Sequence, residues 1–200
     1  MTNRIDVLDK GYIELINCIG DDDTIARVAK FTRYTPFVQD KKSTKMLIKT
    51  LMNKGHTSTF EFVEFTFKVK CPIFVARQWM RHRTWNYMEV SRRMVSTKPD
   101  YFLDVDCIAI GKLEKVYNYI DNVYLELLQQ GVRPEIARTI LPLGTYTEFY
   151  AKVDLNNLLK FLDKRLDNSA QKEIREYAVA ILQFLKDIVP MTTDYFLERR

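Results

Sequence analysis

The amino-acid sequence predicts an α+β fold in which helices pack on a mostly antiparallel sheet. Three observations lead to this expectation. Apolar and polar residues alternate between residues 65 and 70, which is typical of a half-buried strand. Other segments repeat apolar residues at helical spacing. Strands and helices do not alternate regularly, as they would in a parallel βαβ fold. No repeat or Gly/Ser-rich linker interrupts the chain, so we expect one domain over residues 1–200.

The first half of the chain contains signals for a hairpin, two helices and a strand. Residues 5–15 read as a hairpin of apolar and polar residues around Gly11. Three aspartates begin the segment 21–29 and can cap a helix there. A second helix is expected from Ser43, and Gly55 is placed to end it. The strand over residues 65–70 comes next.

The middle of the chain is predicted to be mainly helical. Pro72 closes the strand and suits the first turn of a helix that runs to Trp79. Apolar residues at helical spacing between 113 and 127 mark a long amphipathic helix, which ends before Gly131. A short helix is expected to begin at Pro134.

The last quarter of the chain is predicted to contain one strand and two helices. Residues 146–153 read as a strand. Asp154 is expected to cap the helix that follows. We expect Asn168 to cap the final helix, which runs over about residues 170–188 and ends before Pro190.

The composition is that of a globular protein rather than a disordered one. Of the 200 residues, 46% are hydrophobic and 28% are charged. The formal net charge of +5 favours anionic ligands, whereas a dedicated nucleic-acid binder usually concentrates its lysines and arginines further. We therefore expect a small anionic ligand and no nucleic-acid partner.

The cysteines and histidines indicate neither a zinc site nor a disulfide framework. Cys18, Cys71 and Cys107 are far apart, and the chain has only two histidines. Free thiols are typical of the reducing cytosol. The N-terminus lacks the apolar run of a signal peptide, and no segment suits a membrane span. We expect a cytoplasmic protein without a metal or a membrane contact.

The candidate functional residues are concentrated between Arg77 and Arg93, where five arginines occur within seventeen residues. The planar guanidinium group matches phosphate oxygens in a bidentate way, so this stretch can hold a phosphate. Trp79, Trp85 and Tyr87 lie among the charges and offer flat surfaces for a ring system. Without further evidence, an arginine-rich run is better explained as a solvated basic surface after a helix.

The spacing of four residues in this stretch resembles a family signature. Arg81, His82 and Arg83, followed after seven residues by Ser91, match the pattern of the flavin-dependent thymidylate synthases. The resemblance extends over roughly residues 3 to 190. The other matching segments are Gly55-His56 with Phe60-Glu61, Pro72 to Trp79, Ala137-Arg138 with Leu141 to Leu143, and Arg165 with Ala170, Gln171, Glu173 and Ile174.

The resemblance implies an activity, its cofactors and an assembly. Enzymes of this family are homotetramers with active sites between subunits. They take a methylene group from methylenetetrahydrofolate and reduce it with a hydride from the flavin of FAD. NADPH supplies that hydride, and dUMP becomes dTMP. Matched by position, the nucleotide set consists of Gln78, Glu89, Ser91, Arg93, Arg138 and Arg165. The flavin set consists of Thr32, Ser58, Glu61, Arg81, His82 and Arg83.

Within the nucleotide set, Arg165 and Ser91 are the candidate catalytic residues. Arg165 would stabilise negative charge that spreads over the uracil oxygens as C5 becomes nucleophilic. Arg93 and Arg138 suit the 5′-phosphate, beside which Ser91 can donate a hydrogen bond. Ser91 lacks an obvious histidine base, which makes it a poor nucleophile. We interpret Cys71, at a strand-to-helix corner, as a small buried hydrophobe.

The sequence departs from the family pattern at several positions. Asn86 and Met88 replace Ser and Asn, and Ser169 replaces a frequent His. Where the family offers Asn, Arg and Asn to the flavin, this chain has Asp154, Asn156 and Lys160. The changes add a negative charge and remove a bidentate donor, so we expect weaker flavin binding with uridylate binding retained. Ordinary drift among divergent members explains the same changes.

Three other functions compete with thymidylate synthesis. A related dUMP hydroxymethylase would transfer the methylene group without full reduction. A degenerate member would bind the nucleotide as a sensor or a structural subunit. A protein of another class, a basic single-stranded nucleic-acid-binding module, would use the arginines with their interleaved aromatic residues. Glu61 and Glu89 lie within that basic surface and count against the last interpretation.

Overall fold

The computed structural model describes residues 3–104 and 106–200 and confirms the α+β fold class. Five strands form one sheet in the order β1-β2-β3-β5-β4, and every neighbouring pair is antiparallel. The strands are β1 (Arg4–Val7), β2 (Gly11–Ile19), β3 (Glu64–Pro72), β4 (Asn86–Glu89) and β5 (Tyr146–Asp154). The expected hairpin and the two expected longer strands are therefore confirmed, whereas β4 was not predicted.

Eight α-helices and two short 3₁₀ helices complete the described part of the chain. The α-helices are α1 (Asp22–Phe31), α2 (Lys41–Asn53), α3 (Ile73–Trp79), α4 (Ile110–Gln129), α5 (Pro134–Ala137), α6 (Leu155–Arg165), α7 (Lys172–Ile188) and α8 (Pro190–Glu198). The 3₁₀ helices are η1 (Ser58–Phe62) and η2 (Arg138–Ile140). Among the described residues, no helix is long and apolar enough to cross a bilayer.

Two helix caps follow the sequence signals. Asp21 is the N-cap of α1, where its carboxylate accepts a hydrogen bond from the backbone N–H of Thr24 at 2.8 Å. Asp154 caps α6 in the same way, accepting from the backbone N–H of Asn157 at 2.9 Å. Each carboxylate satisfies a backbone donor that has no partner within its helix.

The predictions for the other helix starts need correction. The second helix begins at Lys41 rather than Ser43, because the Asp40 side chain caps it. Pro72 is the N-cap of α3 and the last residue of β3, so it lies just outside the predicted first turn.

The prediction that Asn168 caps the final helix is wrong. Gln171 is the N-cap residue of α7, and Asn168 instead accepts a hydrogen bond from the side chain of Arg175. Two terminal helices were expected, but three are present, because Pro190 begins α8 instead of following the last helix. Proline favours the first turn of a helix as readily as it ends one, so the residue type was ambiguous.

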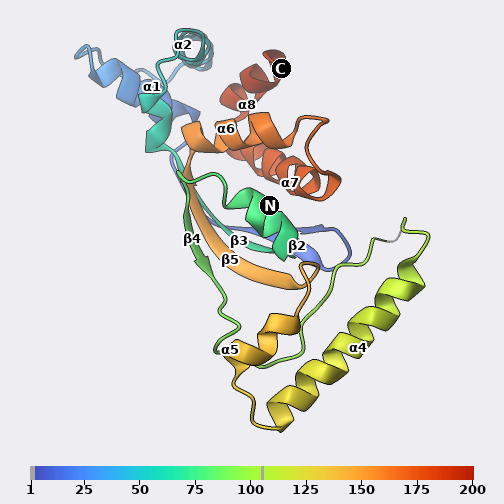
Figure 1. Cartoon of the computed structure of the whole chain (residues 1–200). Coiled ribbons are helices and arrows are strands. Elements are labelled where there is room, and N and C mark those ends of the chain that lie inside the picture. Colours follow the sequence, from blue (N-terminus) through green and yellow to red (C-terminus); the bar gives the residue numbers. More distant parts are fainter. Residues whose placement is uncertain (1–2, 105) are drawn as a thin grey trace.

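One face of the sheet is covered and the other carries charged side chains. Helices α3, α6 and α7 pack on the covered face (Figure 1). Alternation along β3 buries Phe65, Phe67 and Val69 against these helices. The opposite face bears ion pairs between neighbouring strands, such as Lys152 with Glu64 at 2.8 Å. The predicted alternation of residues 65–70 is thus confirmed.

The tryptophans of the arginine-rich stretch belong to the core. Trp79 is fully buried, and its ring meets those of Trp85, Phe149, Phe161 and Tyr177 with centroids 5.0–5.8 Å apart. Trp85 is also buried. The expectation that these rings form a surface for a ligand is therefore wrong, because packing gains more from burying large aromatic side chains.

The predicted role of Cys71 is supported by its surroundings. The side chain is fully buried at the corner between β3 and α3, and burial raises the pKa of its thiol well above the ordinary value. The thiol therefore stays protonated and packs as a small hydrophobe.

The long helix α4 lies apart from the sheet. It extends beside α5 at the end of the molecule opposite α1 and α2 (Figure 1). Only Asp121 and Tyr124 are buried along its length. The buried Asp121 accepts a hydrogen bond from the Tyr101 hydroxyl at 2.7 Å and pairs with Lys98 at 3.0 Å. These contacts hold the segment before α4 against the helix.

Candidate active site

The arginine-rich stretch runs from α3 through a turn into β4. Helix α3 is anchored by the buried Val75, Ala76 and Trp79, and β4 pairs with β5 at the sheet edge. Tyr87, in β4, donates from its hydroxyl to the backbone oxygens of Trp79 and His82, each at 3.1 Å. This hydroxyl therefore fixes the turn that carries Arg81, His82 and Arg83.

Arg165 reaches this turn from the end of α6. Its Nε donates to Nε2 of His82 at 3.2 Å, and its Nη2 donates to the backbone oxygen of Gln78 at 2.9 Å. The Gln78 side chain in turn donates to Oε1 of Gln171, at the start of α7, at 2.5 Å. Residues far apart in the sequence thus form one hydrogen-bonded group, which we call the Arg165 group (Gln78, His82, Arg165 and Gln171).

The protonation of His82 is affected by its surroundings. Partial burial is the largest cause that lowers its pKa below the ordinary value of 6.5, and the positive charges of Arg165 and Arg81 lower it further. His82 is consequently neutral at physiological pH.

A cavity of about 660 Å³ opens on the other side of α3. Glu89 and Arg138 of the nucleotide set line it, together with Arg77 of α3. Successive residues of a helix point about 100° apart. Arg77 and Gln78 therefore face the cavity and the Arg165 group, respectively. We call this space the basic cavity.

The basic cavity carries an excess of positive charge. Its lining contains five basic side chains, Lys70, Arg77, Arg92, Lys98 and Arg138, and three acidic ones, Glu89, Asp100 and Glu148. Lys70 pairs with Asp100 at 2.7 Å and lowers the pKa of that carboxyl group. Among the described residues, the guanidinium groups of Arg77 and Arg138 have no hydrogen-bonding or ion-pair partner. They are available for an anion.

Glu89 and two more residues of the nucleotide set, Ser91 and Arg93, lie at this cavity or in the turn beside it. Glu89 accepts a hydrogen bond from the Thr147 hydroxyl at 2.7 Å. Ser91 Oγ accepts from the backbone N–H of Arg93 at 3.4 Å, and the Arg93 side chain pairs with Glu135 at 3.3 Å. Arg93 is therefore partly neutralised by a residue of α5.

The flavin set is divided between two places. Thr32 and Ser58 line a pocket of about 540 Å³ between α1, α2 and η1, together with Lys30, Arg33 and Lys54. No carboxylate is among the described residues that line it. Arg81, His82 and Arg83 lie instead in the turn after α3. We call the first place the α1–α2 pocket.

Glu61, the remaining residue of the flavin set, lies in η1 and is held there by one of the residues that depart from the family pattern. The side-chain amide of Asn156 donates to Glu61 Oε1 at 3.1 Å, and Asn156 is buried. Asp154 is occupied in capping α6. Two of the substituted residues are therefore used within the fold, and Ser169 likewise donates to Asp167.

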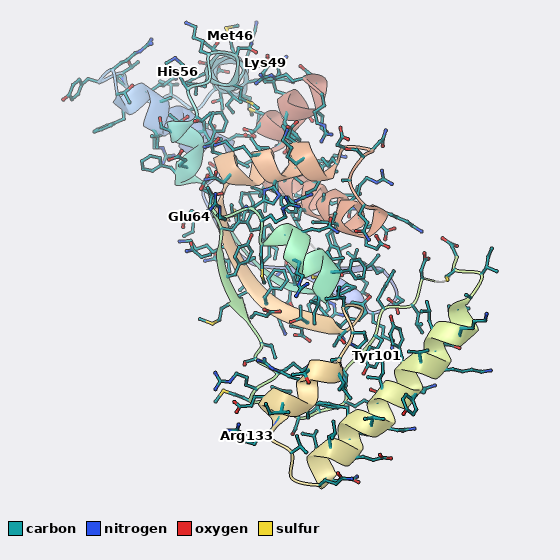
Figure 2. All side chains as sticks on the ribbon, in the orientation of Figure 1. Met46, Lys49, His56, Glu64, Tyr101 and Arg133 are labelled. Carbon is teal, nitrogen blue, oxygen red and sulfur yellow. The ribbon has the colours of Figure 1, made fainter. Side chains whose placement is uncertain are left out.

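The α1–α2 pocket and the basic cavity lie at opposite ends of the molecule. His56, which lines the α1–α2 pocket, lies near α2, whereas Tyr101 and Arg133 mark the end near α5 (Figure 2). The basic cavity, with Arg138, is at the α5 end. One chain by itself therefore leaves Thr32 and Ser58 of the flavin set at the other end of the molecule from the basic cavity, although His82 of the same set contacts Arg165 of the nucleotide set.

Sequence reasoning missed several residues of the basic cavity. Arg77 and Arg92 belong to the arginine-rich stretch and share its signal. Lys70 alternates outward along β3 and read as a solvated strand residue. Lys98 lies in a segment with no periodic pattern. No sequence signal distinguished these two lysines, because their position depends on how the segment before α4 folds over the sheet.

The fold and the site together define an α+β protein with a basic cavity suited to a phosphorylated ligand. Residues 14–191 match the family described as thymidylate synthase complementing protein (Thy1). The chain is 39% identical to a flavin-dependent thymidylate synthase of Thermotoga neapolitana, over 98% of this chain and 94% of that one. It is 41% identical to a flavin-dependent thymidylate synthase of Thermus thermophilus, over 97% of this chain and 78% of that one. The chain belongs to the Thy1 family.

A solved structure supports the same relationship. The UMP/dUMP methylase PolB from Streptomyces cacaoi, bound with 5-Br dUMP, superposes with a TM-score of 0.84. The two sequences are 26% identical, and the alignment covers 97% of each chain.

Proposed function

We propose that this protein reductively methylates dUMP to dTMP, with FAD as cofactor, methylenetetrahydrofolate as one-carbon donor and NADPH as reductant. One observation carries the proposal: among the described residues, Arg138 and Arg77 lie in the basic cavity without anionic partners, in a chain whose relatives are named flavin-dependent thymidylate synthases. A phosphate is the ligand that these guanidinium groups suit best.

The 5′-phosphate of dUMP would bind at the basic cavity. Arg138 supplies a guanidinium group there, Ser91 donates its hydroxyl, and Arg93 contributes once the phosphate displaces Glu135. Glu89, in the cavity wall, suits the sugar hydroxyl because a carboxylate accepts hydrogen bonds. Gln78 completes the nucleotide set from the Arg165 group.

Arg165 would act on the uracil ring. Its charge stabilises the electron density that moves to the ring oxygens when C5 attacks the one-carbon unit. No enzyme nucleophile is needed for this step. Ser91 is oriented toward a backbone N–H rather than toward a base, which fits a binding role, and the thiol of Cys71 is protonated and buried.

The donor set of the α1–α2 pocket fits an anionic cofactor such as FAD. Lys30, Arg33 and Lys54 provide positive charge, and Thr32 and Ser58 provide hydroxyl donors. Arg81, His82 and Arg83 would contact the cofactor from another place in the assembly. Bound flavin supplies the hydride that reduces the transferred methylene group. The chain itself contributes binding and orientation.

The separation of the basic cavity from the α1–α2 pocket supports a homotetramer with active sites between subunits. The basic cavity of one subunit would then face the α1–α2 pocket of another. We further propose that the protein works in the cytoplasm, where its three cysteines, all free, remain reduced.

The function is tested by product analysis. The purified protein is incubated with FAD, NADPH, methylenetetrahydrofolate and dUMP, and the nucleotide is identified by mass spectrometry. We expect dTMP, formed only when all four are present. A hydroxymethyl product would identify the sister reaction instead. Binding of dUMP without any product would contradict the proposed activity.

A further inference from the structure

The guanidinium group of Arg165 is held at two points by the turn after α3. Its Nε donates to Nε2 of His82 at 3.2 Å, and its Nη2 donates to the backbone oxygen of Gln78 at 2.9 Å. Within the described part of the chain, Nη1 has no hydrogen-bonding partner. The two contacts fix the plane of the group and leave one edge for a ligand.

His82 is itself fixed in place. Its ring packs edge-on against Phe161 of α6 with a centroid separation of 4.9 Å. Its backbone N–H donates to the oxygen of Trp79 at 3.0 Å, and its backbone oxygen accepts from Tyr87 at 3.1 Å. The imidazole is therefore a rigid support rather than a mobile surface side chain.

The hydrogen bond to Arg165 requires a neutral imidazole. Arginine can only donate, so Nε2 of His82 must accept and its proton must reside on Nδ1. Protonation of Nε2 would direct an N–H of one cation at an N–H of another. The charged groups that act on the ring are Arg165 from α6 and Arg81 from its own turn, both positive.

We propose that His82 is a positioning residue, which orients Arg165 for the uracil ring and releases it on protonation. The inference rests on the proposed function, in which Arg165 meets the nucleotide. It assigns His82 a part in binding dUMP through another residue, separate from any contact with flavin.

The direction in which the pKa of His82 is shifted determines how the affinity for dUMP depends on pH. The pKa of His82 is lowered from 6.5, first by burial and then by the two arginines. At a pH above the lowered pKa, the neutral ring of His82 holds Arg165. As the pH falls below about 6.5 and through the lowered pKa, the ring gains a proton, the contact breaks, and affinity for dUMP decreases.

The first test measures dUMP affinity by calorimetry between about pH 5 and 8. His82→Gln retains an oxygen that accepts from Arg165 but does not titrate, whereas His82→Phe retains only the packing on Phe161. At the upper pH we expect His82→Phe to bind roughly tenfold more weakly than the wild type, and His82→Gln to recover most of that loss. Equal affinities of wild type and His82→Phe would overturn the proposal.

The second comparison isolates the titration of His82. The phosphate of dUMP also titrates, with a pKa of about 6, but it does so equally in every variant. We expect the wild type to lose roughly tenfold more affinity than His82→Gln on acidification. His56→Gln removes the only other histidine. This variant should still lose affinity for dUMP on acidification, as the wild type does. Identical pH profiles for wild type and His82→Gln would reject the inference.

A ligand-free measurement separates this inference from the proposed function. The pKa of His82 is followed by NMR in the wild type and in Arg165→Gln. We expect it to rise in the variant, because a cation and a donor are removed. An unchanged pKa would contradict the contact whether or not dUMP binds. If the contact is present but no form binds dUMP, the proposed function fails instead. These measurements also decide the question if His82→Phe does not fold.

Discussion

The arginines of this protein have different roles that depend on their surroundings. Arg165 is held by His82 and Gln78, and Arg93 is paired with Glu135. Arg199 donates to the backbone oxygen of Met52 at the end of α2, a structural contact at a helix C-terminus. Arg77 and Arg138 have no partner among the described residues. Since an unpaired guanidinium group has its full donor capacity available, these two are the best candidates for a phosphate.

At the residue scale, we predict that Arg138→Ala weakens dUMP binding. The lost charge-assisted hydrogen bonds contribute about 1.5–3 kcal/mol, which corresponds to roughly a tenfold to hundredfold change in the dissociation constant. Calorimetry at constant salt measures it. Arg199→Ala, at the far end of the molecule, is the matched control and should leave the affinity unchanged. Similar dissociation constants for Arg138→Ala and the control would rule out this phosphate site.

Helices α1 and α8 are joined by one buried carboxylate. Asp22, in the first turn of α1, is 5% exposed. It accepts hydrogen bonds from the backbone N–H groups of Met191 and Thr192 at 2.7 and 3.1 Å, and from the Thr192 hydroxyl at 2.6 Å. The carboxylate thus satisfies the N-terminus of a helix about 170 residues away in sequence. Val189, the formal N-cap of α8, has no side-chain oxygen to do so.

At the element scale, we predict that Asp22→Ala destabilises the protein by about 1–3 kcal/mol, because it leaves buried backbone donors unsatisfied. The free energy of unfolding in urea measures the loss. Asp194→Ala removes an exposed aspartate from α8 itself and should change stability by less than about 0.5 kcal/mol. If both substitutions cost the same, the link between α1 and α8 contributes nothing.

The first turn of α6 carries a second prediction at this scale. Asp154 caps the helix and Asn156 holds Glu61, so neither offers the donors that the family pattern leads us to expect for the flavin. We predict that FAD binds at least tenfold more weakly than in a relative with Arg at position 156, and that Asn156→Arg strengthens it. Fluorescence titration measures both. Tight binding by the unchanged protein would show that Lys160 or other residues compensate.

At the scale of the whole molecule, the basic cavity and the α1–α2 pocket are two separate places in one chain, although His82 contacts Arg165. The basic cavity lies near α5, and the α1–α2 pocket lies at the other end of the sheet (Figure 1). The sheet face opposite α3, α6 and α7 carries ion pairs rather than a helical layer. Such an arrangement is consistent with subunits that complete each other's sites.

We predict that two inactive variants restore activity when they are refolded together. Arg138→Ala disables the basic cavity, and Ser58→Glu adds a negative charge to the α1–α2 pocket. If each site takes these residues from different subunits, mixed assemblies contain some sites without either change. The assay is dTMP formation by the mixture. A mixture of Arg138→Ala and Glu89→Ala, which alter one cavity, should stay inactive. If the first mixture forms no dTMP, Arg138 and Ser58 come from the same subunit at each site.

Several features of the site could be predicted from the sequence because their signals are local. The motif from Arg81 to Ser91 is a short stretch, and the strand and helix before it are defined by alternation and by Pro72. The aromatic residues of the same stretch were misinterpreted. Trp79 and Trp85 are equally compatible with a ligand surface and with a core, and only their neighbours Phe149, Phe161 and Tyr177 decide between the two.

Strand β4 shows why some elements were not predicted. Its four residues, Asn86 to Glu89, have no strong alternation and are mostly exposed. They form a strand because β5 offers an unpaired edge, with Tyr87 opposite Ala151. The capping of α8 by Asp22 likewise depends on a contact over a long sequence distance.

The sequence by itself determined the α+β class, the longer strands and helices, the caps at Asp21 and Asp154, and the family, because periodicity, capping and motif spacing act over a few residues. Only the tertiary structure decided which of these residues meet. It grouped Arg165 with His82, left Arg138 without a counterion among the residues that the structure describes, and separated the basic cavity from the α1–α2 pocket. The physical reason is that hydrogen bonds and charges depend on distance in space, which the packing of the helices on the sheet sets.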